Sequence, residues 1–454
     1  MSSAALKTFF LSLTPRPFLP YWRRLESSPL GYRLAKGAFW SLVGTLLSRS
    51  LTVISSILVA RMLGKTGMGE LGIIQNTVGI LSALAGLGMG LTATKYVAEY
   101  RHDQPARAGA MLRLSATTAW TSGLLMTLTM LLLAPWFARH TIAAPHLAGL
   151  LRAGSVLLLL GAVNGAQMGA LAGFEAFATI ARVNFLAGLL SLPLMAGGAA
   201  WLGLNGAVGG LVASNLVNCV LSHLHLRRQA ATAGVPLAAR FSRQEWNLLW
   251  AFSVPSVLCG TIFGPVNWAC CALLVNRPGG YAEMGLFNVT MSWFSAVTFL
   301  PGVLAQVLLP LLSAQQAERA HDRSRKLVIL ATKANALAAF PVAVLIACAS
   351  PIIMSLYGPE FREGWPTLVL TALTAAIIAL HGPAAQSIIA GNHMWPYLAM
   401  HLGWGSVYFA ATFAFVSYGA FGLAIARMLA YLLSSLAVFL YAARNCWPAT
   451  QDTH

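Results

Sequence analysis

Two stretches of the sequence, ELGIIQNT at residues 70–77 and EMGLFNVT at residues 283–290, share a glutamate, a glycine and a threonine at a separation of 213 residues. Two further matches recur at similar separations: Ala172-Gly173 with Ala390-Gly391, and Gly203 with Gly419. The separations stay between 213 and 218 residues along the chain. Three matches at nearly the same separation rarely arise by chance, so we infer an internal repeat that divides the chain into two halves.

The composition excludes a soluble protein. The chain of 454 residues is 57% hydrophobic and 9% charged, with a mean hydropathy of +0.70, whereas a soluble domain carries about 25% charged residues. Apolar runs of about 20 residues recur along the chain, and each is long enough to cross the ~30 Å hydrocarbon core of a bilayer. The sequence therefore predicts an all-α polytopic membrane protein.

The hydropathy pattern predicts twelve transmembrane helices. They fall at residues 38–60, 71–94, 113–137, 150–171, 180–202, 206–224, 246–275, 284–311, 328–354, 366–389, 395–417 and 420–442. Each repeat then holds an even number of spans, so the repeats run parallel, related by an axis along the membrane normal. We expect two pseudo-symmetric six-helix bundles with a cleft between them, which is the architecture of a transporter.

Lysine and arginine predict the orientation. Most of the 29 basic residues fall in segments that are cytoplasmic if the N-terminus is inside, as the positive-inside rule requires. Both termini are therefore predicted to be cytoplasmic. The expected organisation is a basic cytoplasmic tail or a disordered segment over 1–36, an N-lobe over 37–225, a cytoplasmic linker over 226–245, a C-lobe over 246–443 and a short tail over 444–454. The net charge of +17 is spread over short loops, which argues against nucleic-acid binding.

Polar residues follow one face of several predicted spans. In span 1 they include Thr45, Arg49 and Thr52, on an arc of about 120° at helical spacing. Span 7 contributes Asn267, and span 8 contributes Asn288 and Gln306. These residues are candidates for a substrate cavity. The alternative is that the small polar residues only hold neighbouring helices together.

Arg49 and Arg427 lie inside predicted spans, and Lys95 lies at the end of another. A buried arginine costs at least ~2.5–3.5 kcal/mol and normally faces a partner or a wet cavity. Because all twelve acidic residues fall in tails, loops or span ends, we expect these cations to attract an anion, and the planar guanidinium suits phosphate. Hydrogen bonds to backbone carbonyls are the alternative. His381 is a further cavity candidate, with a packing role as its alternative.

Enzymes and metal proteins find no support in the sequence. The six cysteines show no CxxC or Cys/His spacing, so neither a metal site nor a cofactor is predicted. The predicted outer loops are too short for a catalytic domain. Walker A, GxSxG and HExxH motifs are missing from the sequence.

The beginning of the chain resembles a known family. KGAFWS at residues 36–41, SILVARMLG at residues 56–64 and GMGELG at residues 67–72 are similar to the start of Wzx-type oligosaccharide flippases. These flippases form the polysaccharide-transporter branch of the MATE/MOP exporter superfamily. The resemblance covers nearly the whole chain from about residue 36.

The resemblance implies a MATE/MOP-like fold with a central cavity, alternating access and a multi-pass location in a bacterial inner membrane. It implies a substrate of undecaprenyl-pyrophosphate-linked oligosaccharide, moved from the cytoplasmic to the outer leaflet for O-antigen or exopolysaccharide biosynthesis. Membrane lipids, a polysaccharide polymerase and assembly proteins are the implied partners. The alternatives are a MATE-like exporter of drugs or small amphipathic molecules, and a scaffold that does not transport.

Overall fold

The computed structural model describes residues 29–237, 262–317 and 321–447, and within these ranges its regular structure is helical. The N-terminal half consists of α3 (Pro29–Gly86), α4 (Met89–Tyr100), α5 (Pro105–Trp136), η2 (Phe137–Thr141), η3 (Pro145–Leu147), α6 (Ala148–Gly154), α7 (Val156–Gly173) and α8 (Phe177–Thr232). The C-terminal half consists of α10 (Phe263–Val275), α11 (Gly280–Ala317), α12 (His321–Tyr357), η4 (Pro359–Gly364), α13 (Trp365–Ala390), α14 (Met394–Phe415), η5 (Val416–Tyr418), α15 (Gly419–Tyr441) and η6 (Ala442–Cys446).

The described residues contain eight helical segments that are long and apolar enough to cross a membrane, which confirms the predicted all-α membrane class. Three of the segments, Leu47–Tyr100, Phe177–Thr232 and Met394–Cys446, each cover two predicted spans. A straight helix of 54 residues would be about 80 Å long, far more than a bilayer needs. Predicted span 7 is described only from residue 262 onward. The division into twelve spans and two six-helix bundles stays a prediction.

Glycines break the longest helices. Gly64 interrupts α3 with φ 66° and ψ −176°, and Gly203 interrupts α8 with φ 57° and ψ −135°. Gly419, which the repeat equates with Gly203, has φ 63° and ψ −140° at the start of α15. Positive φ is accessible to glycine because it lacks a Cβ atom. The matching backbone angles at Gly203 and Gly419 support the repeat found in the sequence.

The helix limits differ from the predicted domain limits at two places. α3 begins at Pro29, so the last part of the segment predicted as a tail is helical. α8 continues to Thr232, into the segment predicted as a linker. The rest of that linker from residue 238 lies outside the described residues.

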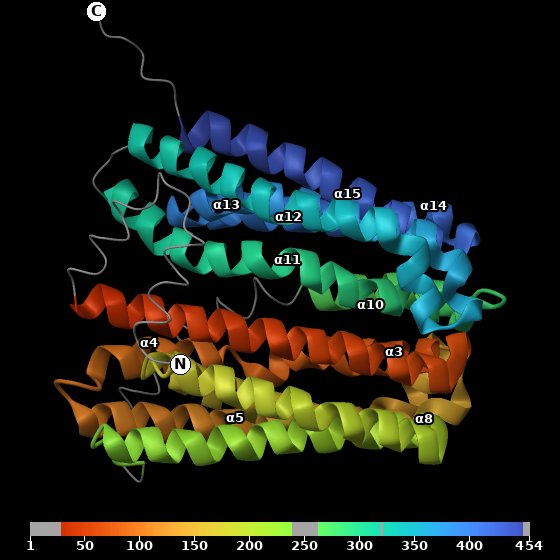
Figure 1. The fold of residues 1–454 in the computed structure, drawn as a ribbon, viewed down its shortest axis with the longest axis horizontal. Coiled ribbons are helices and arrows are strands. Elements are labelled where there is room, and N and C mark those ends of the chain that lie inside the picture. The colour runs from red at the N-terminus through yellow and green to blue at the C-terminus, as the bar shows by residue number, and fades with distance from the viewer. Residues whose placement is uncertain (1–28, 238–261, 318–320, 448–454) are drawn as a thin grey trace, which may run out of the picture.

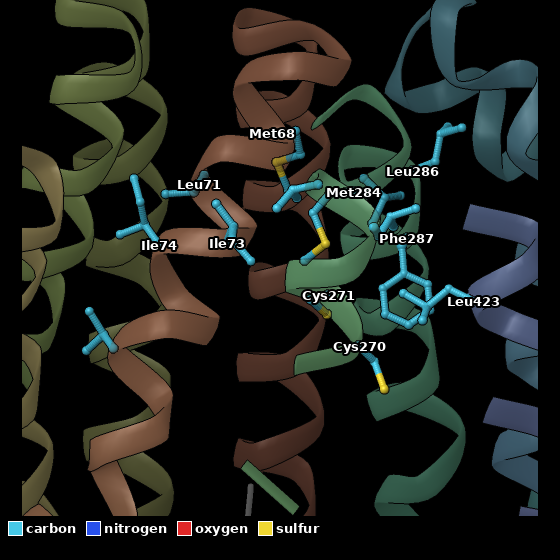
Figure 2. Close-up of a cluster of buried hydrophobic side chains, with 14 of the residues drawn as sticks. Met68, Leu71, Ile73, Ile74, Cys270, Cys271, Met284, Leu286, Phe287 and Leu423 are labelled. Carbon is cyan, nitrogen blue, oxygen red and sulfur yellow. The ribbon is translucent and has the colours of Figure 1, made fainter. Parts of the chain in front are cut away.

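The two halves of the chain lie side by side as two layers of helices, with α3 and α11 facing each other at the boundary (Figure 1). An apolar cluster fills this boundary. Figure 2 shows Met68 and Ile73 of α3 near Met284 of α11, with Cys271 of α10 beside them. We call the region around this cluster the joined end. It contains residues 61–77 of α3, residues 137–142, residues 268–288, and residues 356–360 at the end of α12 and the start of η4.

At the joined end the backbones of α3 and α11 touch. A Cβ atom placed on Gly69 would lie 1.8 Å from the carbonyl oxygen of Tyr281. A Cβ atom placed on Gly285 would lie 2.0 Å from the carbonyl oxygen of Lys65. Small residues at membrane helix crossings permit such close approach. These two glycines therefore set the distance between the halves.

Candidate functional site

A cleft of about 480 Å³ lies between α3 and α11, and its lining comes from these two helices. It is lined by Arg49, Ser50, Thr52, Val53, Ile54, Asn288, Met291, Ser292, Trp293, Ser295, Ala296 and Phe299. Its α3 residues precede the break at Gly64 by 10 to 15 residues, which corresponds to about 15–22 Å along the helix. The cleft thus begins beside the joined end and extends toward the N-terminal end of α3.

Three of the residues predicted from the sequence meet in this cleft: Arg49, Thr52 and Asn288. Arg49 is exposed, and in the described part of the chain no carboxylate pairs with it. The hydroxyl of Thr52 donates to the carbonyl oxygen of Ser48 at 3.0 Å. The amide of Asn288 donates to the carbonyl oxygen of Met68 at 3.4 Å. The cleft therefore offers a free cation together with hydroxyl and amide groups.

Besides three serines, the other wall residues are apolar or aromatic, and the polar pattern of the sequence does not reveal these apolar residues. Val53, Ile54 and Phe299 line the cleft beside Arg49. Trp293 also lines it, and its indole N–H donates to the hydroxyl of Tyr357 at 3.0 Å. The signal available in the sequence is helical spacing, since Ala296 and Phe299 lie four and seven residues after Ser292, on the same face of α11. The wall can therefore contact both polar groups and hydrocarbon.

Arg427 lies behind this cleft, inside the C-terminal half. Its side chain is 8% exposed, and Nη1 donates to the sulfur of Met291, a residue that lines the cleft, at 2.7 Å. Its guanidinium carbon lies 4.5 Å from the ring centroid of Phe294 and 5.8 Å from that of Tyr431. Aromatic faces attract a cation in this geometry. The Nε atom of Arg427 is buried without a hydrogen-bond partner in the described structure.

The other predicted site residues whose side chains are described, His381, Asn267 and Lys95, do not line the cleft. His381 of α13 lies 3.0 Å from the hydroxyl of Ser435, within the C-terminal half. Asn267 of α10 is half-buried, and its Oδ1 atom has no partner among the described residues. Lys95 of α4 is exposed, with its ammonium 4.9 Å from the ring centroid of Tyr96. The side chains of Thr45 and Gln306 lie outside the described part of the structure.

The carboxylates with described partners lie near a helix end or, for Glu70, near the break of α3 at Gly64. Glu70 pairs with His146 at 2.8 Å, and Glu175 pairs with Arg101 at 2.7 Å. Glu283 accepts a hydrogen bond at 2.7 Å from the backbone N–H of Ala420, in the first turn of α15. None of these interactions neutralises Arg49 or Arg427. The charge of the cleft is therefore positive.

A family model described as "Polysaccharide biosynthesis protein" matches residues 34–316. The chain belongs to this family. It is 30% identical over 196 residues to the EPS I polysaccharide export inner membrane protein EpsE of Ralstonia nicotianae, and 26% identical over 196 residues to EpsE of Ralstonia solanacearum. Each match covers 42% of this chain and 44% of the relative, so it spans less than half the length of these relatives. The resemblance to Wzx-type flippases is confirmed at the level of the family.

Solved structures with the same fold belong to the MOP superfamily. The chain resembles an inward-facing multidrug resistance MATE family transporter with a TM-score of 0.74 at 15% identity, over 89% of this chain and 98% of the other. An outward-facing MATE family transporter gives a TM-score of 0.69 at 16% identity, over 91% and 96%. A MOP superfamily transporter from Pyrococcus furiosus, described as having a binding pocket of reverse polarity, gives a TM-score of 0.68 at 15% identity, over 91% of this chain and 96% of the other. At these identities the likeness establishes a MATE-like fold.

Proposed function

We propose that the protein is a flippase that moves undecaprenyl-pyrophosphate-linked oligosaccharide units from the cytoplasmic to the outer leaflet of a bacterial inner membrane. The observation that carries the proposal is the positively charged cleft between α3 and α11, with Arg49 free of a carboxylate partner in the described structure. Membership of the polysaccharide biosynthesis family supports a glycan as the cargo. The polysaccharide export function in the name of the EpsE relatives supports a role in export.

The chemistry of the cleft suits the two parts of such a headgroup. The guanidinium of Arg49 presents a planar fork of donors that binds phosphate oxygens in pairs. Thr52 and Asn288 supply hydroxyl and amide groups that exchange hydrogen bonds with sugar hydroxyls. Thr45, Asn267, Gln306 and His381 are the further sugar-binding candidates of this proposal. Lys95 completes the set of candidate cations.

Arg427 acts from a second layer in this proposal. It is separated from the cleft by Met291, whose sulfur it contacts. In a low-dielectric interior a buried cation projects its potential over several ångströms. Arg427 therefore raises the affinity of the cleft for an anion, and it binds phosphate directly when Met291 moves aside.

We propose that the protein works by alternating access between its two halves, each a bundle of six transmembrane helices related to the other by pseudo-symmetry. With both termini in the cytoplasm, the joined end faces outward and the cleft opens inward. The higher TM-score of the inward-facing neighbour agrees with this assignment. A rocking motion would part the joined end and present the headgroup to the outer leaflet, while the polyprenyl tail stays in lipid.

The membrane potential favours this direction. An inside-negative potential assists the outward movement of an anion by about 2.3 kcal/mol per charge per 100 mV. The transport cycle therefore has a driving force without a proton-binding carboxylate in the spans. Catalysis is not part of the proposal: the protein is a transporter that works beside a polysaccharide polymerase and assembly proteins.

The proposed domain organisation follows the two halves. The N-lobe spans 37–225 and the C-lobe 246–443, with the cytoplasmic linker 226–245 between them and tails at 1–36 and 444–454. Export of drugs or small amphipathic molecules is the competing function of this fold. Typical cationic substrates would be repelled by Arg49 and Arg427, so drug susceptibility of a sensitised host distinguishes the two functions.

Complementation of glycan export tests the proposal. A strain that lacks the protein receives the native chain or the Arg49→Ala, Arg49→Lys or Arg427→Ala variant at matched membrane levels. Arg323→Ala is the matched control, because Arg323 is exposed on α12 away from the cleft. We expect loss of export and accumulation of lipid-linked precursor in the inner leaflet for Arg49→Ala, reduced export for Arg427→Ala, and partial rescue by Arg49→Lys.

The control variant should export normally. Normal export by both alanine variants at Arg49 and Arg427 would contradict the anion-binding role of the cleft. Loss of export in the Arg323→Ala control would show instead that any change of surface charge disturbs the protein.

A further inference from the structure

Hydrogen bonds between the two halves gather at the joined end. They run from Arg61 to Leu356, from Lys65 to Glu360, from Asn276 to Thr141, from Tyr281 to Ile142, from Asn288 to Met68 and from Trp268 to Thr77. Residues 49–54 of α3, which line the cleft, take part in none of these six bonds, whereas Asn288 makes one of them and also lines the cleft. In the described part of the chain, these bonds fasten the two halves to each other at the joined end.

Two of these hydrogen bonds occupy equivalent positions in the two repeats. Nε of Arg61 donates to the carbonyl oxygen of Leu356 at 2.6 Å, and Nδ2 of Asn276 donates to the carbonyl oxygen of Thr141 at 2.6 Å. The two donors are 215 residues apart, and so are the two acceptors, within the 213–218 range of the repeat. Each half therefore gives one donor to the other half and receives one in return.

The acceptors lie where helices leave carbonyl groups unpaired. Thr141 is the last residue of η2, and Leu356 is the next to last residue of α12. The last four carbonyls of a helix lack partners within the helix, and this end carries a partial negative charge. A donor from the opposite half satisfies such a carbonyl, and the guanidinium of Arg61 also complements the helix dipole.

Neighbouring contacts extend each bond. Beside Thr141, the hydroxyl of Tyr281 donates to the carbonyl oxygen of Ile142 at 2.7 Å. Near Leu356, the backbone N–H of Lys65 donates to Oε2 of Glu360 at 3.3 Å. Arg61 and Asn276 are both exposed, so water competes for the bonds that they make. A hydrogen bond of this kind contributes modestly and can open reversibly.

We propose that Arg61 and Asn276 form a paired latch, a conformational device that holds the outer ends of the halves together until the cleft is loaded. The proposal rests on the alternating access described under the proposed function. When the latch opens, both donors and both carbonyls become hydrated, so no polar group is left buried and unpaired. The symmetric pair resists separation on both sides of the boundary, where one bond alone would allow the halves to pivot.

Distance measurements between spin labels test the latch without any cargo. Labels are placed on Arg139→Cys in the N-terminal half and Glu363→Cys in the C-terminal half, two exposed positions near the joined end. The background lacks the native cysteines and is checked for an unchanged melting temperature. The purified protein in lipid nanodiscs is compared with the Arg61→Ala, Asn276→Ala and double variants. Arg277→Ala is the matched control, since Arg277 is the exposed neighbour of Asn276.

The native protein should show mainly the short label distance. Each single variant should raise the ratio of long to short distances about 2- to 12-fold, and the double variant about 5- to 150-fold, because each hydrogen bond contributes a similar amount. Arg277→Ala should leave the ratio unchanged. If the double variant fails to fold, the two single variants decide the question.

An unchanged distance distribution in the two single variants would overturn the latch, as would an equal shift in Arg277→Ala. The outcome is separable from the identity of the cargo. A shift of the label distance combined with normal export by Arg49→Ala would support the latch and contradict the proposal that the cargo carries a pyrophosphate. Loss of export by Arg49→Ala without any shift of the label distance in the latch variants would support the pyrophosphate cargo and contradict the latch.

Discussion

The crossing of α3 and α11 predicts a large difference between two glycine substitutions on the same helix. Gly285 and Gly302 both lie in α11, but a Cβ atom on Gly285 would lie 2.0 Å from the carbonyl oxygen of Lys65, whereas one on Gly302 meets nothing within 4 Å. Replacing a mid-helix glycine by alanine gains about 0.5–1 kcal/mol of helix stability. Gly302→Ala should keep this gain, and Gly285→Ala should not.

The cost at Gly285 follows from the geometry. An approach of 2.0 Å is more than 1 Å shorter than ordinary carbon–oxygen contact, and the atom that it meets is backbone, so α3 and α11 have to move apart. Overpacking of this kind typically costs about 1–3 kcal/mol. After subtraction of the propensity gain, we expect Gly285→Ala to lose up to about 2 kcal/mol of stability.

Thermal unfolding in detergent, followed by intrinsic tryptophan fluorescence, measures the difference. Gly285→Ala should lower the melting temperature, while Gly302→Ala should leave it unchanged or raise it. Gly69 lies on the other side of the crossing, and a Cβ atom added to it would lie 1.8 Å from the carbonyl oxygen of Tyr281. Gly69→Ala should therefore lower the melting temperature as Gly285→Ala does. Equal melting temperatures for the Gly285→Ala and Gly302→Ala variants would refute the close crossing of the two helices.

Three further predictions follow from single contacts. Glu283→Ala removes the acceptor of the Ala420 N–H bond and should cost about 0.5–2 kcal/mol, as the loss of a helix cap does, visible as a lower melting temperature. Arg427→Met removes a buried cation and should leave the melting temperature unchanged or higher while glycan export falls; a lower melting temperature with normal export would assign Arg427 a structural role. Trp293→Phe removes the hydrogen bond to Tyr357 and should cost about 0.5–1.5 kcal/mol, a loss that Tyr357→Phe should reproduce in a double-mutant cycle.

Hydropathy and the repeat predict much of the fold. The class of the protein follows from the length and apolar character of the runs, because a bilayer demands both. The equivalence of Gly203 and Gly419 is visible in the sequence, and the structure gives the two glycines similar backbone angles. The break of α3 at Gly64 is harder to locate, since the segment around it also holds Gly67 and Gly69, and only the positive φ distinguishes Gly64 from them.

The candidate site is only partly predictable. Helical periodicity places Arg49 and Thr52 on one face of α3, and that face lines the cleft. Periodicity cannot say which neighbouring helix covers a residue, and for this reason the position of Arg427 behind Met291 emerges only from the structure. Of the two aromatic rings beside Arg427, Tyr431 lies one helical turn away on α15, but Phe294 comes from α11, far away in the sequence.

The latch has a consequence for how the family can vary. Its acceptors are main-chain carbonyls, which every amino acid provides, so the residues at positions 141 and 356 can drift without loss of the contact. The donors at positions 61 and 276 lack this freedom, because they need a side-chain N–H of suitable reach. Comparison of many relatives should therefore find few residue types at the donor positions 61 and 276, with no correlated change at the acceptor positions 141 and 356. A search for contacts by correlated substitution would overlook the very bonds that join the two halves.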